Sequence, residues 1–271
     1  MFQGFNIENL YFENGSDGLF NKGLSLYDEM STSIQEKLSF LKDKKCVLNA
    51  EKIQSDWFPN IKTDIFISHS HADKNLAIAF AGWLSDKFGL RSFIDSCLWG
   101  YCDELLRIID DNFCENDDRK TYNYKSRNAS TSIVHMILMN ALTKMIDNTE
   151  CLMFLNTPNS IVLKDDISEK TYSPWIFSEI ETSRYIRKIV PDRLKTRIKD
   201  STKYFSTLNE SQIKAAFPAN TSHLIKLNCN DLNKWCNSYN LRNSYNLRNK
   251  YYPSQEGFPL NYLYMTKNII S

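Results

Sequence analysis

Four short apolar runs lie in the middle of the chain, at residues 64–68, 91–95, 150–155 and 223–228. They are rich in Ile, Leu and Phe, bounded by polar residues and short, as is typical of strands buried in a sheet. Segments long enough to form helices separate them. Strands that alternate with helices favour right-handed crossovers and a parallel sheet. The pattern therefore predicts an α/β fold with a doubly wound parallel sheet.

Helical patterns with clear start and stop signals fill the intervals. Asp73 is a candidate N-cap, and Gly89 occupies the position expected just past the end of the helix that follows. Ser173-Pro174 combines a capping residue with Pro at the first helical position, so a helix is expected from there to about Lys188. The preceding stretch, 158–171, is expected to be a loop.

Three parts are expected along the chain: an N-terminal extension with one helix (1–60), a central domain (61–228) and a C-terminal extension (229–271). Residues 1–24 have no clear period and predict a loosely ordered arm. The six residues from Ser238 are repeated without mismatch from Ser244. Two copies are too few for a solenoid. The repeat is better explained as a slipped duplication in a surface segment that tolerates insertions. The alternative is a segment whose Tyr and Arg side chains stack on nucleic-acid bases.

Composition narrows the function classes. The chain has 271 residues, of which 33 are Lys or Arg and 32 are Asp or Glu, so its net charge is +1. A charge this balanced does not indicate nucleic acid or a membrane as a partner. No apolar stretch approaches the roughly 20 residues that span a bilayer, and no signal peptide is visible. Seven scattered Cys without a CxxC favour free thiols in a reducing compartment, so a cytoplasmic location is expected.

Candidate chemistry gathers where strands end, because ligands of parallel sheets bind at the carboxyl ends of the strands. The loops after Ser68, Asp95 and Asn156 are therefore the predicted site. His69 and His71 form a poor metal signal without a third ligand, and no metal site is expected. The chain contains no P-loop, GxGxxG or GxSxG, which disfavours ATP hydrolysis, a Rossmann redox cofactor and α/β-hydrolase chemistry.

Trp175 and Glu179 are four residues apart and share one face of the predicted helix. An indole beside a carboxylate offers a flat surface for a ring and shields the carboxylate from water. Such a carboxylate could stabilise the positive charge that develops on a ribose when its N-glycosidic bond breaks. The alternative is a core Trp and a solvated Glu on an ordinary amphipathic helix. Glu181 is the fallback carboxylate, whereas three loop carboxylates are expected to be solvated: Asp165, Asp166 and Glu169.

Three motifs, in this order, resemble the TIR (Toll/interleukin-1 receptor) domain family. Residues 64–70, DIFISHS, with Asp73 resemble its first strand and loop; residues 91–95, RSFID, resemble its second strand; and residues 175–179, WIFSE, resemble its W-x-x-x-E helix. The resemblance extends from Asp64 to Asn228 and implies a flavodoxin-like TIR domain. Each motif alone is weak, but together they are moderately specific.

The departures from receptor TIR domains favour a bacterial subgroup. Residues 96–100, SCLWG, lack the charged Pro-Gly character of the usual BB loop, and residues 115–128 form a polar insertion, expected as a surface loop. Such elaboration resembles the TIR proteins of bacterial anti-phage defence, especially the NAD-processing component of Thoeris systems. Residues 132–136, SIVHM, are similar to that subgroup.

The resemblance implies an enzyme that cleaves the nicotinamide–ribose bond of NAD, an NAD glycohydrolase or ADP-ribosyl cyclase. Glu179 would be catalytic, and Ser68, His69, Asp95 and Trp175 would bind the substrate. NAD would be consumed, with no cofactor. The product would be a cyclic or modified ADP-ribose messenger that reaches a downstream effector, and TIR–TIR self-assembly is a further expectation.

Two other classes stay open. One is a non-catalytic TIR module that signals by protein–protein interaction, which has no need of Glu179. The other is a nucleoside-processing enzyme of related shape, such as a deoxyribosyltransferase, which would ignore NAD. Release of nicotinamide from NAD would distinguish the NAD-cleaving enzyme from both of these classes.

Overall fold

The computed structural model describes residues 1–12, 17–35, 53–55, 58, 61–116, 121–164, 168–195, 217–248 and 257–270. The strands are β1 (Gln3–Glu8), β2 (Ile65–Ser68), β3 (Ser92–Ile94), β4 (Cys151–Asn156), β5 (Val162–Lys164), β6 (Ser168–Thr171), β7 (Phe217–Pro218) and β8 (Ile225–Leu227). The helices are α1 (Asp17–Gln35), α3 (Lys74–Phe88), α4 (Ser96–Phe113), α5 (Tyr124–Asn148), α6 (Pro174–Tyr185), α7 (Cys229–Arg248) and α8 (Pro259–Thr266).

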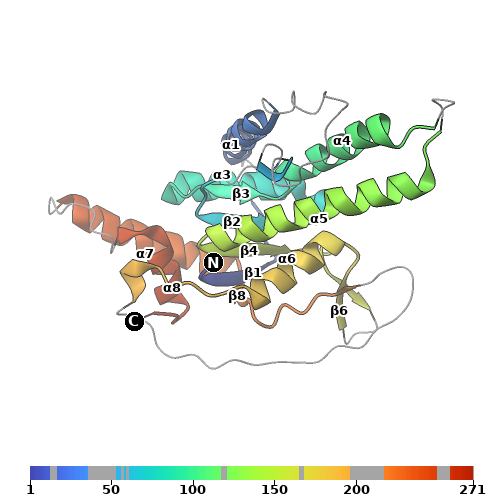
Figure 1. The fold of residues 1–271 in the computed structure, drawn as a ribbon. Coiled ribbons are helices and arrows are strands. Elements are labelled where there is room, and N and C mark those ends of the chain that lie inside the picture. Colours follow the sequence, from blue (N-terminus) through green and yellow to red (C-terminus); the bar gives the residue numbers. More distant parts are fainter. Residues whose placement is uncertain are drawn as a thin grey trace.

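A five-stranded sheet in the order β3-β2-β4-β1-β8 forms the centre of the molecule (Figure 1). Every pairing within it is parallel. The predicted α/β class, a doubly wound parallel sheet of flavodoxin-like form, is confirmed. All four strands of the sequence analysis are present, each within two residues of its expected limits at either end. Strands β2, β3 and β4 are buried on both faces, which is why they are continuous apolar runs rather than alternating ones.

The prediction of a loosely ordered arm over residues 1–24 is wrong. Residues 3–8 form β1, which pairs with β4 along its whole length and with β8 over three residues. The sheet therefore takes one inner strand from the segment assigned to an N-terminal extension. Gly4 and Asn6 make the run a weak strand signal on its own, but pairing on both edges satisfies the backbone of β1 and overrides local propensity.

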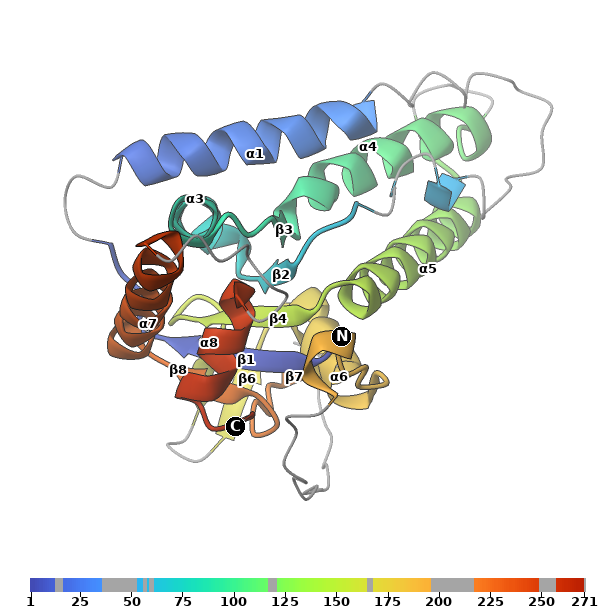
Figure 2. The same cartoon turned by 90° about the vertical axis from the view of Figure 1, so that its left-hand side faces the viewer.

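Helices cover both faces of the sheet (Figure 2). In that view α3, α7 and α8 lie on one side of the strands, α5 and α6 lie on the other, and α1 lies across the β3 edge against α3. The apolar spacing over residues 32–41 is the pattern that predicts the one helix of the N-terminal extension. It overlaps only the last turn of α1, and residues 36–41 fall outside the described part of the chain. No helix in the described part of the chain has the length and apolar character needed to cross a membrane.

Helices α1 and α3 approach closely at a pair of glycines. A Cβ placed on Gly23 would lie 1.9 Å from the carbonyl oxygen of Ile78, and one on Gly82 would lie 1.9 Å from that of Leu19. No larger residue fits either position without separating the helices, because real Cβ atoms do not approach backbone oxygens so closely. The two glycines thus fix α1 against the body of the fold.

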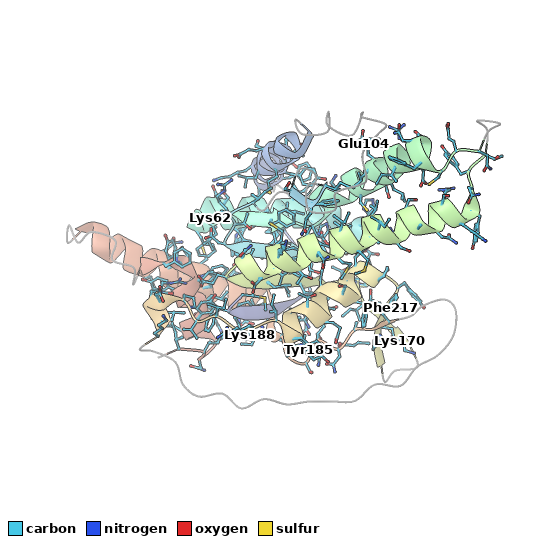
Figure 3. The ribbon with its side chains drawn as sticks, in the orientation of Figure 1. Lys62, Glu104, Lys170, Tyr185, Lys188 and Phe217 are labelled. Carbon is cyan, nitrogen blue, oxygen red and sulfur yellow. The ribbon has the colours of Figure 1, made fainter. Side chains whose placement is uncertain are left out.

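The loop predicted for residues 158–171 is also wrong. Strands β5 and β6 form an antiparallel hairpin there, and β7 extends it to a three-stranded sheet. Figure 3 labels Lys170 of β6 and Phe217 of β7, two neighbouring strands of this second sheet; Lys170 is paired with Pro218, and Phe217 with Thr171. The run contains charged residues and no clear alternation, so the hairpin gave little sequence signal.

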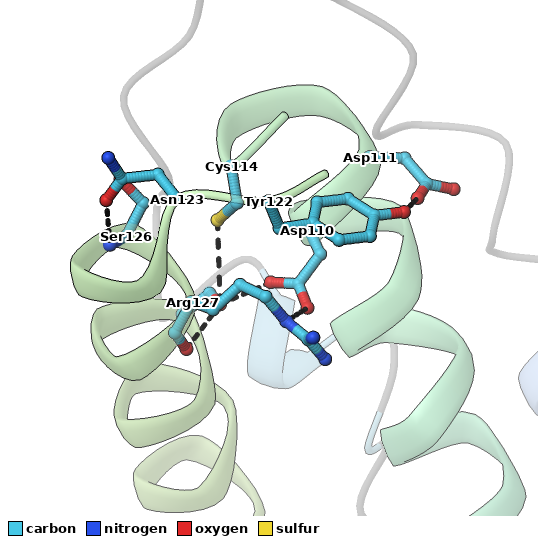
Figure 4. A network of polar contacts seen from close by, with 8 residues as sticks. Asp110, Asp111, Cys114, Tyr122, Asn123, Ser126 and Arg127 are labelled. Carbon is cyan, nitrogen blue, oxygen red and sulfur yellow. Dashed lines mark hydrogen bonds and ion pairs between the residues drawn. The ribbon is translucent and has the colours of Figure 1, made fainter. Parts of the chain in front are cut away.

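Helices α4 and α5 form a long antiparallel hairpin, and the polar insertion predicted for 115–128 is only partly a loop. Helix α5 begins within it, at Tyr124, where the side chain of Asn123 accepts a hydrogen bond from the backbone N–H of Ser126. Near this end of the hairpin the buried carboxylate of Asp110 accepts hydrogen bonds from Ser130 and Arg127 (Figure 4). These bonds join the two helices by satisfying a carboxylate that burial would otherwise penalise.

The C-terminal helices pack on the sheet. Trp235 of α7 is fully buried and stacks on Phe88 of α3, with 3.9 Å between ring centroids. Tyr264 of α8 donates a hydrogen bond of 2.9 Å to the carboxylate of Glu150, which also binds Arg193. The SYNLRN duplication, expected in a tolerant surface segment, continues α7 up to Arg248. Tyr239 of its first copy packs against Phe88, so that copy contributes to the fold.

Candidate active site

Two loops at the carboxyl edge of the sheet bring three of the predicted residues together. Ser68 ends β2 and His69 follows it, while Asp95 follows β3, the neighbouring parallel strand. The register aligns Ile67 with Ile94, and the backbone N–H of Asp95 donates to the carbonyl of Ile67 at 3.4 Å. Parallel pairing therefore places the polar residues after the two strands side by side.

Helix α6 adds Glu179 to this group. Ser173 caps the helix by accepting a hydrogen bond from the N–H of Ile176, and Pro174 begins it, as the sequence predicts. The side chain of Glu179 is 1% exposed, and the hydroxyl of Ser68 donates a hydrogen bond of 2.6 Å to its Oε2. Four of the five predicted site residues thus meet in one buried cluster, which we call the Glu179 cluster: Ser68, His69, Asp95 and Glu179.

The environment of Glu179 favours its protonated form. Burial raises the pKa of Glu179 well above its usual value, and the nearby Asp95 carboxylate raises it further, while the hydrogen bond from Ser68 opposes the shift. Glu179 and Asp95 lie within hydrogen-bonding reach of each other. The contact with a second carboxylate makes Glu179 keep its proton more readily, because two adjacent negative charges are costly where water is excluded.

His69 supplies the counter-charge to Asp95. Its Nδ1 lies 2.6 Å from Oδ1 of Asp95, and both side chains are buried. Burial lowers the pKa of His69, but the Asp95 charge and contact outweigh burial, so the net shift of the pKa is upward. The second ring nitrogen, Nε2, is buried and has no hydrogen-bond partner among the described residues. A buried N–H of this kind is available to a bound polar group.

Asp73 is a contributor that the sequence analysis treated as a helix cap and as part of the first motif, not as a site residue. It occupies the N-cap position of α3, but its side chain makes no capping hydrogen bond. Its carboxylate instead accepts hydrogen bonds from Thr157, at 2.5 Å, and Asn159, at 2.7 Å, in the loop after β4. It also helps to raise the pKa of His69. Asp73 therefore connects the Glu179 cluster to the loop after β4, a long-range contact that one sequence cannot reveal.

The remaining candidates lie elsewhere. Trp175 is half-buried, and its ring meets the edge of His135 on α5, with centroids 5.3 Å apart. His71 is exposed while His69 is buried, so the two do not form a pair. Glu181 forms an ion pair of 3.3 Å with Arg184. Asp165 and Asp166 lie outside the described residues.

Glu169 differs from its expected role as a solvated loop carboxylate. It lies on β6, is only partly exposed, and accepts a hydrogen bond from Thr221. Within the described part of the chain, no group of three or more His, Cys, Asp or Glu side chains is placed to hold a metal ion.

The Glu179 cluster combines a protonatable carboxyl, a hydroxyl that orients it, and a charged His–Asp pair, all shielded from water. Such a group can stabilise positive charge and hold sugar hydroxyls, because electrostatic interactions are strong where water is excluded.

Comparison with known proteins does not identify the chain: no family model, no curated protein and no solved structure matches it.

Proposed function

We propose that this protein is a TIR-type enzyme that cleaves the nicotinamide–ribose bond of NAD. The observation that supports the proposal most is the buried Glu179, which is oriented by Ser68 and placed beside Asp95 and His69. These four residues are among the five that the motif resemblance implies for the site. NAD is the substrate, and the chain needs no cofactor for this reaction.

The chemistry follows from the charge on the substrate. The nicotinamide of NAD is cationic and leaves as a neutral base, so positive charge moves to the ribose as the bond breaks. Glu179 faces that ribose as a carboxylate and stabilises the oxocarbenium-like state. The incoming cation favours loss of the Glu179 proton, since an opposite charge favours the ionised carboxyl.

Binding has to open the site first. Glu179 is 1% exposed, so a ribose reaches it only after neighbouring side chains move. Closure around the substrate then excludes water, which favours attack by a group of the substrate itself over hydrolysis. The proposed product is accordingly a cyclic or modified ADP-ribose, acting as a messenger to an effector in anti-phage defence.

The test is incubation of the purified protein with NAD, with nicotinamide measured by chromatography and the other product by mass. Wild type is compared with Glu179→Gln and with Glu181→Gln, a matched control on the same helix. Several protein concentrations are included, because opening of the site could depend on self-assembly. Release by wild type and Glu181→Gln but not by Glu179→Gln is expected. No release at any concentration would favour the interaction module, and cleavage of deoxyribonucleosides without NAD cleavage would favour a deoxyribosyltransferase.

A further inference from the structure

A cavity of about 410 Å³ lies beyond the carboxyl ends of β1 and β4, outside the Glu179 cluster. Its walls combine the carboxylates of Glu8 and Glu169 with an apolar group: Pro158, Ile161 and Val162. The volume falls within the range of small-molecule sites, and carboxyl ends of parallel strands are where such sites form. None of the four residues of the Glu179 cluster lines it.

Buried polar side chains hold the two carboxylates in place. Asn6 is fully buried on β1 and donates to Oε1 of Glu8 and to Oγ1 of Thr221, each at 3.4 Å. The hydroxyl of Thr221 in turn donates to Oε2 of Glu169 at 3.1 Å. The side-chain amide group of Asn6 makes both of these bonds, so the network fixes the carboxylates before any ligand arrives.

Each carboxylate keeps one oxygen for a ligand. Lys226 and Asn6 both contact Oε1 of Glu8, and Thr221 contacts Oε2 of Glu169; no described residue hydrogen-bonds to the other oxygen of either group. Fixed acceptors of this kind suit a donor-rich group, and the two hydroxyls of a ribose supply neighbouring donors.

The rest of the lining suits a flat base. Pro158, Ile161 and Val162 supply apolar surface, and the amides of Asn9 and Asn156 can both donate and accept at its edge. The charge balance disfavours phosphates, because among the described residues the two carboxylates have one ion-pair partner, Lys226, whose side chain is 70% exposed. A neutral nucleoside therefore fits the cavity better than a nucleotide.

We propose that this cavity is a binding site for a ribonucleoside, with Glu8 and Glu169 holding the 2′- and 3′-hydroxyls. The site is separate from the Glu179 cluster and goes beyond the proposed cleavage of NAD. Thr157 lines the cavity and also donates to Asp73, so the loop after β4 connects the cavity to the residue beside the Glu179 cluster.

Calorimetric titration of the full chain with the four common ribonucleosides tests the proposal. The best binder is then compared with its 2′-deoxy form and its 5′-monophosphate. Glu169→Gln removes one carboxylate charge at the cavity, Val162→Phe fills the cavity, and Glu181→Gln serves as the control away from it. Circular dichroism and a thermal midpoint for each variant show that it is folded.

The expected result is one nucleoside bound per chain, with at least tenfold weaker binding of both the 2′-deoxy form and the monophosphate. Glu169→Gln should weaken binding about tenfold or more, because a hydrogen bond to a charged group is stronger than one to a neutral amide. Val162→Phe should weaken binding by a similar factor, because the larger side chain fills the cavity. Absence of binding up to millimolar concentration, or equal binding of the deoxy form, would overturn the proposal. Binding lost in Glu179→Gln and kept in Glu169→Gln would place the nucleoside in the Glu179 cluster and overturn it as well.

Discussion

Replacing Glu179 by Gln should make the protein more stable at neutral pH. Gln keeps the shape of the side chain, and its carbonyl can still accept the hydrogen bond from Ser68. Its amide N–H can occupy the place of the proton between Glu179 and Asp95. The substitution removes a carboxyl group that tends to ionise as the pH rises, and with it the free-energy cost of burying that group.

The sign follows from proton linkage. Burial raises the pKa of Glu179 well above its unfolded value of 4.5, so the native state binds the proton more tightly than the unfolded state. The stabilisation is complete below the unfolded pKa and is lost as the pH rises towards the folded pKa. Within that window the free energy of unfolding falls by up to about 1.4 kcal/mol per pH unit. Glu179→Gln lacks this slope, so its advantage over wild type grows with pH.

Urea unfolding of wild type and Glu179→Gln at each pH unit from 5 to 8 measures the effect. The pKa of His69 is also raised and adds its own loss of stability at higher pH, but His69 is present in both proteins. Glu181→Gln is the control, because Glu181 is ion-paired with Arg184 on the same helix. A Glu179→Gln variant that is no more stable than wild type at pH 8, or that keeps the same slope, would refute the reasoning.

Three further predictions test other parts of the structure. Asp95→Asn should lower the pKa of His69, because burial lowers that pKa and the Asp95 charge no longer opposes it; an unchanged imidazole titration by NMR would count against this. Gly82→Ala should lower the free energy of unfolding, measured in urea, by about 1–3 kcal/mol, since the added Cβ would lie 1.9 Å from the backbone of α1. An equally stable Gly82→Ala variant would contradict the close helix contact. Tyr264→Phe should lower the free energy of unfolding by about 1.5–3 kcal/mol, because it loses the hydrogen bond to the Glu150 carboxylate. An unchanged thermal midpoint would contradict this prediction.

The central sheet was largely predictable because three of its strands are continuous apolar runs flanked by capped helices. The Ser173-Pro174 signal located α6 correctly and so placed Glu179 on the right element. The meeting of Ser68, Asp95 and Glu179 was predictable only in outline. It follows from the rule that strand ends converge, together with the motif resemblance.

What the sequence could not reveal depends on contacts between distant segments. Strand β1 contains Gly4 and Asn6, and it is stable as a strand because β4 and β8 pair with both of its edges. The hairpin of β5 and β6 has no regular apolar alternation. Asp73 has the local context of a cap, and its hydrogen bonds to the loop after β4 depend on a tertiary approach across more than eighty residues.

The most direct test of the account is the initial rate of nicotinamide release from NAD by wild type and Glu179→Gln under identical conditions. Loss of a carboxylate that stabilises developing charge should reduce the rate about 10²–10³-fold, while the variant stays folded. A Glu179→Gln variant that releases nicotinamide as fast as wild type would contradict the central claim, because the buried carboxyl of α6 would then have no part in the reaction.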